Sequence, residues 1–260
     1  MNIRTSNSIR SACLVVFLLT IGGLSVSAQT NDYNKLEGYV GYSAARFKTN
    51  LESASFTSNS GTQTFSSLCS AATGEMIGVN SQKFFCERRT FHGFDASITY
   101  NLTRYIGIKG NVDGHFKSSA YVDRFTPPGV TQTLANEERL YNFLGGIQIK
   151  DNSRTTRIKP FAHLLAGVAR YTNRQSQILD LFPQFNFTIN DSVTSPALKL
   201  GGGLDIRAGK RIDIRVIELD YNPIFTRDRN AQSISGPFST VSFKGTTAHN
   251  FTIGFGIVIH

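Results

Sequence analysis

Apolar and polar side chains alternate along eight segments of the chain, each rich in β-branched, aromatic and glycine residues. In the last segment, apolar side chains occupy every second position from Phe251 to Ile259, and Asn250, Thr252, Gly254 and Gly256 have the other parity. A period of two is typical of β-strands with one apolar and one polar face. The predicted strands cover residues 35–48, 91–100, 104–117, 138–150, 158–172, 196–207, 211–225 and 247–259.

The connections between these segments alternate in length. The long ones are residues 49–90, 118–137, 173–195 and 226–246, and the short ones are 101–103, 151–157 and 209–210. Barrels of bacterial outer membranes have this asymmetry, with tight periplasmic turns and longer outer loops. The pattern therefore predicts an all-β fold, an eight-stranded antiparallel up-and-down transmembrane β-barrel with four long outer loops.

The seventh segment contains an interruption of its alternation. Asp213 and Arg215 share one parity, whereas Glu218 and Asp220 have the other. One extra residue in a strand shifts the parity of everything that follows it. We therefore predict a β-bulge near Val216.

Alternation alone does not decide which face of the barrel points outward. A soluble lipocalin-like carrier has the same period with an apolar lumen. Here the polar faces carry glycines and charges of both signs, which suits a narrow, crowded lumen, and the chain has no tryptophan. We therefore expect the apolar faces to meet lipid, and the soluble carrier remains the alternative.

Opposite charges inside can pair with one another. The predicted lumenal charge network is Asp95, Lys109, Asp113, His115, Lys199, Asp205, Arg207, Asp213 and Arg215. An eight-stranded barrel is filled by its own side chains, so we expect no general porin channel.

The first residues have the layout of a secretory signal. A basic start leads into an apolar run from Ala12 to Ile21, and small residues follow up to Ala28. This order predicts a cleaved signal peptide over residues 1–28 and a single mature domain over residues 29–260. Export and a scattered net charge of +9 argue against nucleic-acid binding. The expected partners are outer-membrane lipid and lipopolysaccharide, the barrel-assembly machinery during insertion, and a surface ligand at the long loops.

Two cysteines remain after the predicted signal, Cys69 and Cys86. In an oxidising periplasm an isolated pair is best explained as a disulfide, worth about 3 kcal/mol for a loop of this length. A metal site would need further ligands nearby, and His92 stands alone. We therefore predict a disulfide, no metal site and no cofactor.

An enzymatic role has weak support. No histidine pair has the spacing of a zinc site. A lipid-modifying barrel enzyme is the main rival hypothesis, and its nearest candidate group is His115 with Ser118, Ser119 and Asp123. The His-any-Ser pattern of lipid A deacylases is absent. We therefore expect no catalytic residues.

Two further segments allow two interpretations each. Residues 179–187 are unusually apolar for an exposed loop, so they either extend the strands beyond the membrane, which we favour, or form a binding patch. Arg154, Arg157 and Lys159 lie at a predicted short turn, where solvated side chains are the default and contact with lipid phosphate is the alternative.

Several short segments resemble the OmpA-like β-barrel proteins of Gram-negative envelopes. They are residues 37–42, 93–100, 160–170, 201–207 and 215–221, and their order and spacing span almost all of the mature chain. The end of the chain departs from the family, because His260 stands where the family's assembly signal usually has phenylalanine. The resemblance implies an outer-membrane location and a non-enzymatic role that is structural, adhesive or envelope-stabilising.

Overall fold

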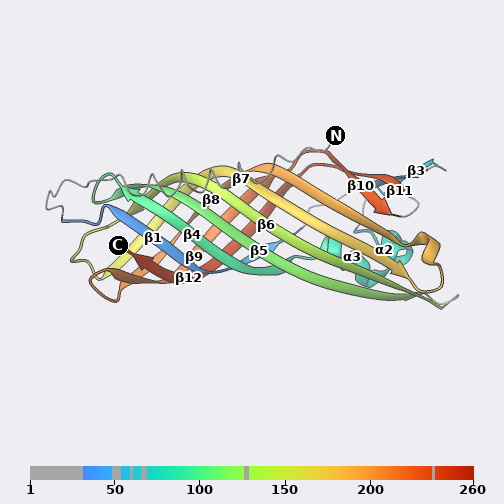
Figure 1. Cartoon of the computed structure of the whole chain (residues 1–260), viewed down its shortest axis with the longest axis horizontal. Helices are drawn as coiled ribbons and strands as arrows, with labels where there is room; N and C mark the ends of the chain where they lie inside the picture. The colour runs from blue at the N-terminus through green and yellow to red at the C-terminus, as the bar shows by residue number, and fades with distance from the viewer. Residues whose placement is uncertain (1–31, 49–53, 59–60, 66–68, 126–128, 236–237) are drawn as a thin grey trace, which may run out of the picture. The chain divides into compact units, whose positions relative to one another are not determined.

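The computed structural model describes residues 32–48, 54–58, 61–65, 69–125, 129–235 and 238–260. The predicted signal segment, residues 1–28, lies outside these residues. Eight antiparallel strands form a closed barrel, and β8 pairs with β9 to complete the ring (Figure 1). The barrel strands are β1 (Leu36–Phe47), β4 (Arg89–Asn101), β5 (Ile106–Phe125), β6 (Val130–Lys150), β7 (Ile158–Leu179), β8 (Phe187–Arg207), β9 (Ile212–Phe225) and β12 (Thr247–Ile259). The predicted eight-stranded fold is confirmed.

The middle strands are longer than predicted. β5 to β8 contain 20 to 22 residues each, so the predicted loops 118–137 and 173–195 are mostly strand. A strand of that length extends about 70 Å, which exceeds the hydrocarbon thickness of about 30 Å even when tilted. Their outer parts therefore project beyond the apolar belt. The sequence pattern did not predict this extension, because most outward positions of its strands are polar, as they are in loops.

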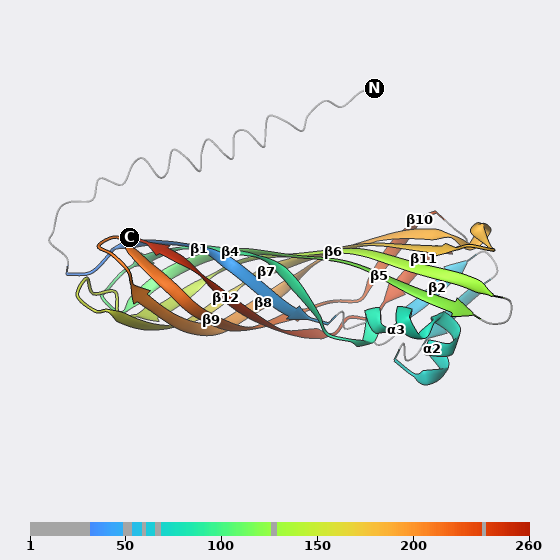
Figure 2. The same ribbon diagram turned by 90° about the horizontal axis from the view of Figure 1, so that it is seen from below.

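The first and last predicted outer loops contain further strands. The first loop forms β2 (Ala54–Ser58) and β3 (Gly61–Phe65), and the last forms β10 (Arg229–Ser235) and β11 (Phe238–Phe243). They continue the sheet sideways from the outer end of β8 in the order β8–β10–β11–β2–β3. Figure 2 shows β10, β11 and β2 beside the far ends of β5 and β6. The described parts of the predicted loops 49–90 and 226–246 thus contribute four strands to an outer sheet, which corrects the prediction that they are loops.

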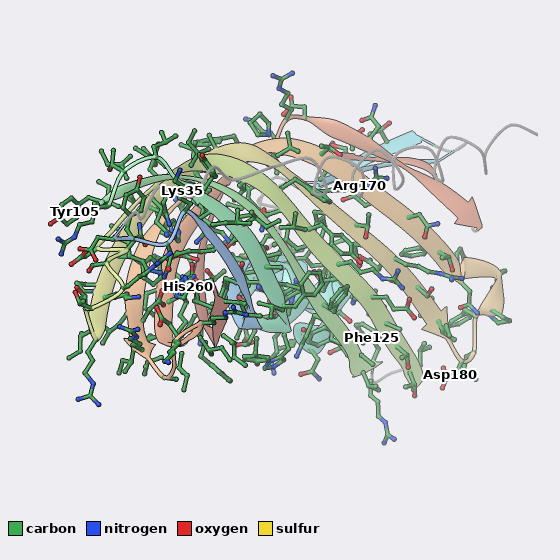
Figure 3. All side chains as sticks on the ribbon, turned by 60° about the vertical axis from the view of Figure 1, so that its left-hand side comes forward. Lys35, Tyr105, Phe125, Arg170, Asp180 and His260 are labelled. Carbon is green, nitrogen blue, oxygen red and sulfur yellow. A yellow bond between two sulfur atoms is a disulfide. The ribbon has the colours of Figure 1, made fainter. Side chains whose placement is uncertain are left out.

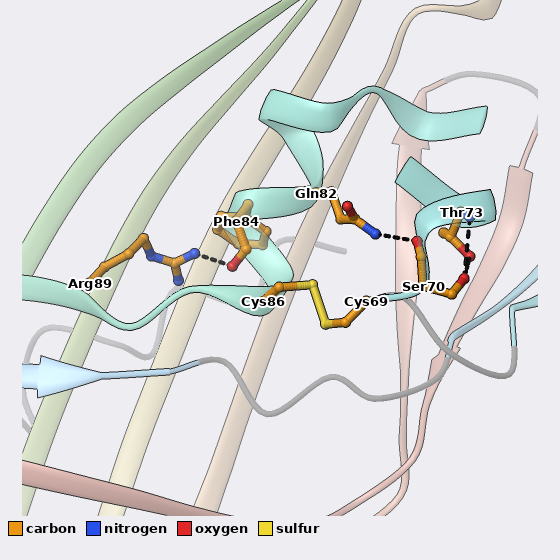
Figure 4. The surroundings of a disulfide bond; sticks show 7 residues. All are labelled: Cys69, Ser70, Thr73, Gln82, Phe84, Cys86 and Arg89. Atoms are coloured by element: carbon orange, nitrogen blue, oxygen red, sulfur yellow. Dashed lines mark hydrogen bonds between the residues drawn. A yellow bond between two sulfur atoms is a disulfide. The ribbon is translucent and has the colours of Figure 1, made fainter. Parts of the chain in front are cut away.

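A helical hairpin completes the first outer connection. It consists of α2 (Ala71–Ile77) and α3 (Val79–Cys86), and the predicted disulfide between Cys69 and Cys86 is present, with the two Cα atoms 5.7 Å apart (Figure 4). Asp123 of β5 fixes α3 by accepting hydrogen bonds from the backbone amides of Asn80 and Ser81, both at 2.8 Å. A carboxylate at this end of a helix satisfies amides that have no partner within the helix.

The outward faces of the barrel strands form an apolar belt. Large hydrophobic side chains there are exposed: Val40, Phe94, Ile98, Ile108, Val112, Phe143, Ile147, Leu164, Val168, Leu200, Ile214, Leu219, Ile253, Phe255 and Ile257. Toward the outer end of the apolar belt, six strands carry an aromatic side chain on the outward face, namely Tyr42, Phe94, Phe116, Tyr141, Tyr221 and Phe251. We call these six residues the outer aromatic girdle. Phe116 and Tyr141 contact each other with ring centroids 5.6 Å apart. Such girdles are typical of the membrane–water interface of outer-membrane barrels.

The predicted bulge in β9 is confirmed. Glu218 lies opposite Gly254 of β12, whereas Arg215 lies opposite Gly256, so two residues of β9 face one of β12. The extra residue returns Glu218 and Asp220 to the lumenal face. The bulge therefore allows both halves of β9 to contribute charge to the interior.

The short turns lie at the opposite end from the strand extension. Figure 3 shows Tyr105 and Lys35 at this end and Phe125 and Asp180 at the other. In the 151–157 turn, Asp151 accepts hydrogen bonds from Arg104 Nε at 2.8 Å and Nη2 at 2.9 Å. The guanidinium holds the pKa of Asp151 well below its usual range, so this pair stays charged in mildly acidic solution. Among the described residues, no helix has the length and hydrophobicity to cross a membrane.

The Asp123→Ala substitution should loosen the helical hairpin without unfolding the barrel. It leaves two amides at the start of α3 without their carboxylate, a loss of about 1–3 kcal/mol in local stability. Hydrogen exchange of the α3 amides should accelerate roughly 5- to 150-fold, while strands β4 and β12 keep their protection. Glu75→Ala, on the exposed side of α2, is the control. Unchanged exchange in α3 would contradict the role of Asp123.

Candidate functional site

The lumen of the barrel holds most of the predicted charge network. Eight of the nine predicted residues are at most 3% exposed and point inward: Asp95, Lys109, Asp113, His115, Lys199, Asp205, Asp213 and Arg215. Ionised groups at such low exposure require partners, because an unpaired buried charge is strongly unfavourable. The structure brings these eight together into two connected groups, one around Arg215 and one around Lys199.

Arg215 is the centre of the first group. Its Nε lies 2.8 Å from Asp205 Oδ1 and its Nη1 lies 3.0 Å from Glu218 Oε2. The rings of Tyr39 and Phe161 cover the two sides of its guanidinium, each centroid 4.0 Å from Cζ. Planar stacking and forked hydrogen bonds are properties of arginine that lysine lacks. Glycine is required beside this group, because a Cβ on Gly256 would lie 2.9 Å from the Tyr39 ring.

Lys199 is the centre of the second group. Its Nζ donates to Asp113, to Asn111 Oδ1 at 2.9 Å and to Asp95 Oδ2 at 3.2 Å. Three acceptors use the three protons of an ammonium group. Asp220 Oδ2 is also near, at 3.9 Å. The two groups join through Lys109, which lies 3.3 Å from both Glu218 Oε1 and His163 Nδ1.

Several lumenal residues were missed by the sequence reasoning: Glu37, Lys150, Lys159, His163, Glu218, Asp220 and His260. Lys150 bridges Glu37 and Asp205, with both distances 2.9 Å. Lys159 was interpreted as a solvated turn residue, which is wrong: it is 1% exposed and lies 2.8 Å from Asp213. His163 lies two residues after Phe161 and four after Lys159 on β7, so it shares their inward parity.

Arg207 is not part of this network. It lies half-buried at the end of β8, and its Nε donates to the carbonyl oxygen of Gly209 in the following turn, at 3.1 Å. It has the inward parity that the sequence indicated, but the barrel ends there. A long side chain at the rim can reach the turn and solvent, so nothing forces it into an ion pair.

An apolar layer lies in the lumen on the outer side of the charges. Its main members are Phe47, Phe91, Leu140, Leu165 and Tyr171, all buried. The Phe47 ring contacts those of Phe91 and Tyr171, with centroids 5.3 and 5.4 Å apart. The alternation predicted polar residues on the inward face, so this apolar layer was not expected. Together, the layer and the ion pairs fill the lumen with side chains.

A second polar cluster lies beyond the apolar layer. Glu138 accepts a hydrogen bond from Tyr171 Oη at 2.7 Å and pairs with Arg89 Nη2 at 2.7 Å. Arg89 also lies over the Phe84 ring of α3, 4.2 Å from its centroid, and donates to the Phe84 carbonyl oxygen (Figure 4). The helical hairpin is thereby connected to the barrel interior.

One lumenal group has the composition of a cation site. Ligand atoms of His163, Glu218 and Asp220 lie within 4.8 Å of one another. The ammonium of Lys109 already lies 3.3 Å from Glu218 and from His163. A metal ion there would meet a fixed positive charge, so the arrangement is better explained as part of the ion-pair network.

The enzymatic candidate suggested by the sequence does not form. Asp123 binds the helical hairpin, and Ser118 faces outward from the barrel. His115 instead contacts Ser43 Oγ through Nε2 at 2.9 Å, and its Nδ1 lies 3.2 Å from Asp113.

This serine–histidine–aspartate contact has the order of a catalytic triad, but it lacks two requirements of one. The three residues are at most 3% exposed. Ser43 lies within β1, which pairs with β4 and β12 on its two sides, so its backbone amides serve the sheet and not an oxyanion. The contacts are suited to holding His115 in place.

The closed sheet, its apolar exterior and its filled lumen define a small antiparallel barrel of the outer-membrane type. No protein-family model matches the chain, and no curated protein matches it.

Solved structures similar to the chain include outer-membrane proteins of bacteria. They include Ail, the attachment invasion locus protein of Yersinia pestis (11% identity, 87% of this chain and 100% of that chain, TM-score 0.39). A second is the outer membrane protein OprG from Pseudomonas aeruginosa (12% identity, 88% of this chain and 98% of that chain, TM-score 0.46). A third is the outer membrane protease OmpT from Escherichia coli (9% identity, 90% of this chain and 99% of that chain, TM-score 0.48). At these identities and scores, the fold rests on the strand pairings of this chain itself.

Replacing Lys199 with Met should destabilise the barrel strongly. The change leaves Asp95 and Asp113 without their common cation, which for buried pairs costs about 3–5 kcal/mol. Urea titration of the refolded protein in lipid vesicles, followed by gel mobility, measures the loss. Lys210→Met, at an exposed turn, should change stability by less than about 0.5 kcal/mol. Equal effects of the two substitutions would show that the lumenal position of Lys199 is unimportant.

Proposed function

We propose that this chain is an outer-membrane β-barrel of the OmpA-like kind, with a structural, adhesive or envelope-stabilising role and no enzymatic activity. The observation that carries the proposal is the inverted distribution of side chains, with hydrocarbon outside and paired charges inside. In hydrocarbon every backbone amide and carbonyl needs a partner within the protein, which a closed barrel supplies.

The soluble-carrier alternative fits this distribution poorly. A lipid carrier needs an apolar lumen with room for its ligand, whereas this lumen contains Arg215, Lys199 and their carboxylates at close quarters. On the exterior, side chains such as Ile98, Leu200 and Phe255 are half exposed over the whole circumference. In water such a continuous apolar surface would drive aggregation.

The filled lumen also argues for a structural role over transport. Molecules passing along the axis would have to displace the ion pairs around Arg215 and then the apolar layer at Phe91 and Leu165. Both sets are held by several strands at once. The interior therefore supports rigidity of the barrel more than passage through it.

The outer extension is the expected site of any adhesive contact. At the end of the β7–β8 hairpin, Leu181, Phe182 and Phe185 are 57%, 39% and 50% exposed around the short helix η1 (Pro183–Phe185). The segment 179–187 thus has its first residue in β7 and its last residue in β8, and the residues between them expose an apolar tip. Exposed apolar groups at an outermost tip are a common feature of interaction surfaces.

Cell fractionation tests the proposal. The mature chain should sediment with outer membranes, and it should migrate differently on gels before and after boiling, because the closed barrel resists unfolding by detergent. A mature chain that is monomeric and soluble without detergent would contradict the proposal.

A serine-reactive fluorophosphonate tests the absence of hydrolase chemistry. Ser43 is buried beside His115 and has no oxyanion donors, so the folded protein should not be labelled at this residue. A purified serine esterase in the same mixture is the positive control. Labelling of Ser43 that disappears in His115→Ala would overturn the non-enzymatic assignment.

A further inference from the structure

Three arginines lie on the outer wall of β6 and β7, immediately beyond the outer aromatic girdle. Along β6, the outward series Phe143 and Tyr141 is followed by Arg139, and along β7, Val168 is followed by Arg170 and Arg174. All three arginines are exposed. Arg170 lies between the turn end and the extended end of the barrel (Figure 3). This position is the level at which lipid headgroups meet an outer-membrane barrel.

The strand register gathers the three guanidinium groups on one surface. Tyr141 lies opposite Arg170, Arg139 opposite Thr172, and Glu137 opposite Arg174. Arg139 is therefore diagonal to both arginines of β7, at a separation that long side chains span easily. Arg170 makes a weak contact with β8, a 3.5 Å approach of its Nη2 to Ser192 Oγ.

The surface has an excess of positive charge. On the outward positions of β6 and β7 beyond Tyr141 and Val168, three arginines face a single carboxylate, that of Glu137. Like charges held close together repel one another unless an anion lies among them. Arginine forms forked, charge-assisted hydrogen bonds to phosphate oxygens, so phosphate is the anion that suits these side chains best.

A hollow lies beyond Arg139 and Arg170, and Arg174 forms part of its lining. Its volume is about 350 Å³, which is within the range of small-ligand sites, and small side chains create it. The lining includes Ser118, Ala120, Ala135 and Ser176 together with Glu137 and Arg174. Hydroxyl and carboxylate groups in such a hollow are suited to the hydroxyl groups of a sugar.

We propose that Arg139, Arg170 and Arg174 bind the phosphate groups of a phosphorylated glycolipid in the outer leaflet, with the lipid A part of lipopolysaccharide as the occupant. Its acyl chains would lie on the apolar belt below, its phosphates among the arginines, and its sugars toward the polar hollow. The phosphate, sugar and acyl parts of one molecule thus meet the three kinds of surface in their order along the strands. The inference rests on the proposed outer-membrane location.

Native mass spectrometry of the full mature chain in detergent, titrated with bis-phosphorylated lipid A, tests the site. The variant Arg139→Gln/Arg170→Gln/Arg174→Gln should bind lipid A at least tenfold more weakly than the unmodified chain. The matched control is Arg157→Gln/Lys210→Gln/Arg211→Gln, which removes the same charge from exposed residues at the turn end. The control should bind as the unmodified chain does.

Further probes separate the sources of phosphate. Monophosphoryl lipid A should bind several-fold more weakly, and phosphatidylglycerol or inorganic phosphate should compete poorly. Equal binding by the triple variant, an equal loss in the control, or full competition by phosphatidylglycerol would each overturn the site.

Fractionation and heat-modifiable migration of the same variants are measured in parallel. A variant that stays in the outer membrane with unchanged lipid A binding refutes the site alone, whereas failure of the unmodified chain to reach that membrane refutes the proposed function.

Discussion

Neutralisation of buried charge is the constraint on which the rest of this barrel depends. Each buried lysine or arginine that the structure describes in the lumen lies within ion-pair distance of at least one carboxylate: Arg89, Lys109, Lys150, Lys159, Lys199 and Arg215. Because these groups neutralise one another, the interior needs no water-filled channel. These charged side chains lie inside, so the outward side chains of the barrel can be apolar, and the sheet can close tightly around its own side chains.

The sequence predicted the barrel well because its strongest signal is the polarity difference between lipid and lumen. Wherever a strand crosses that boundary, its side chains alternate sharply, as from Phe251 to Ile259. Outside the membrane this contrast disappears, since both faces meet polar surroundings. The outer halves of β5 to β8 and the added strands β2, β3, β10 and β11 were therefore missed.

Parity identified members of the charge network but not their partners. It placed Asp95, Asp113 and Lys199 inside, and the parity change in β9 indicated the bulge. The contacts between them depend on strand register and side-chain reach, which alternation does not contain. Lys159 and Arg207 show this limit in opposite ways: both have inward parity near a turn, yet Lys159 reaches Asp213 and Arg207 reaches the Gly209 carbonyl.

The outer sheet has a consequence for the order in which the molecule assembles. β2 pairs with β11, and β1 pairs with β12, so strands from the beginning and the end of the barrel sequence lie side by side. Contacts between residues so distant in sequence form late, because they require ordering of the long chain between them. The outer sheet can therefore form completely only after the last strand has been added, and a stalled or truncated chain would lack it.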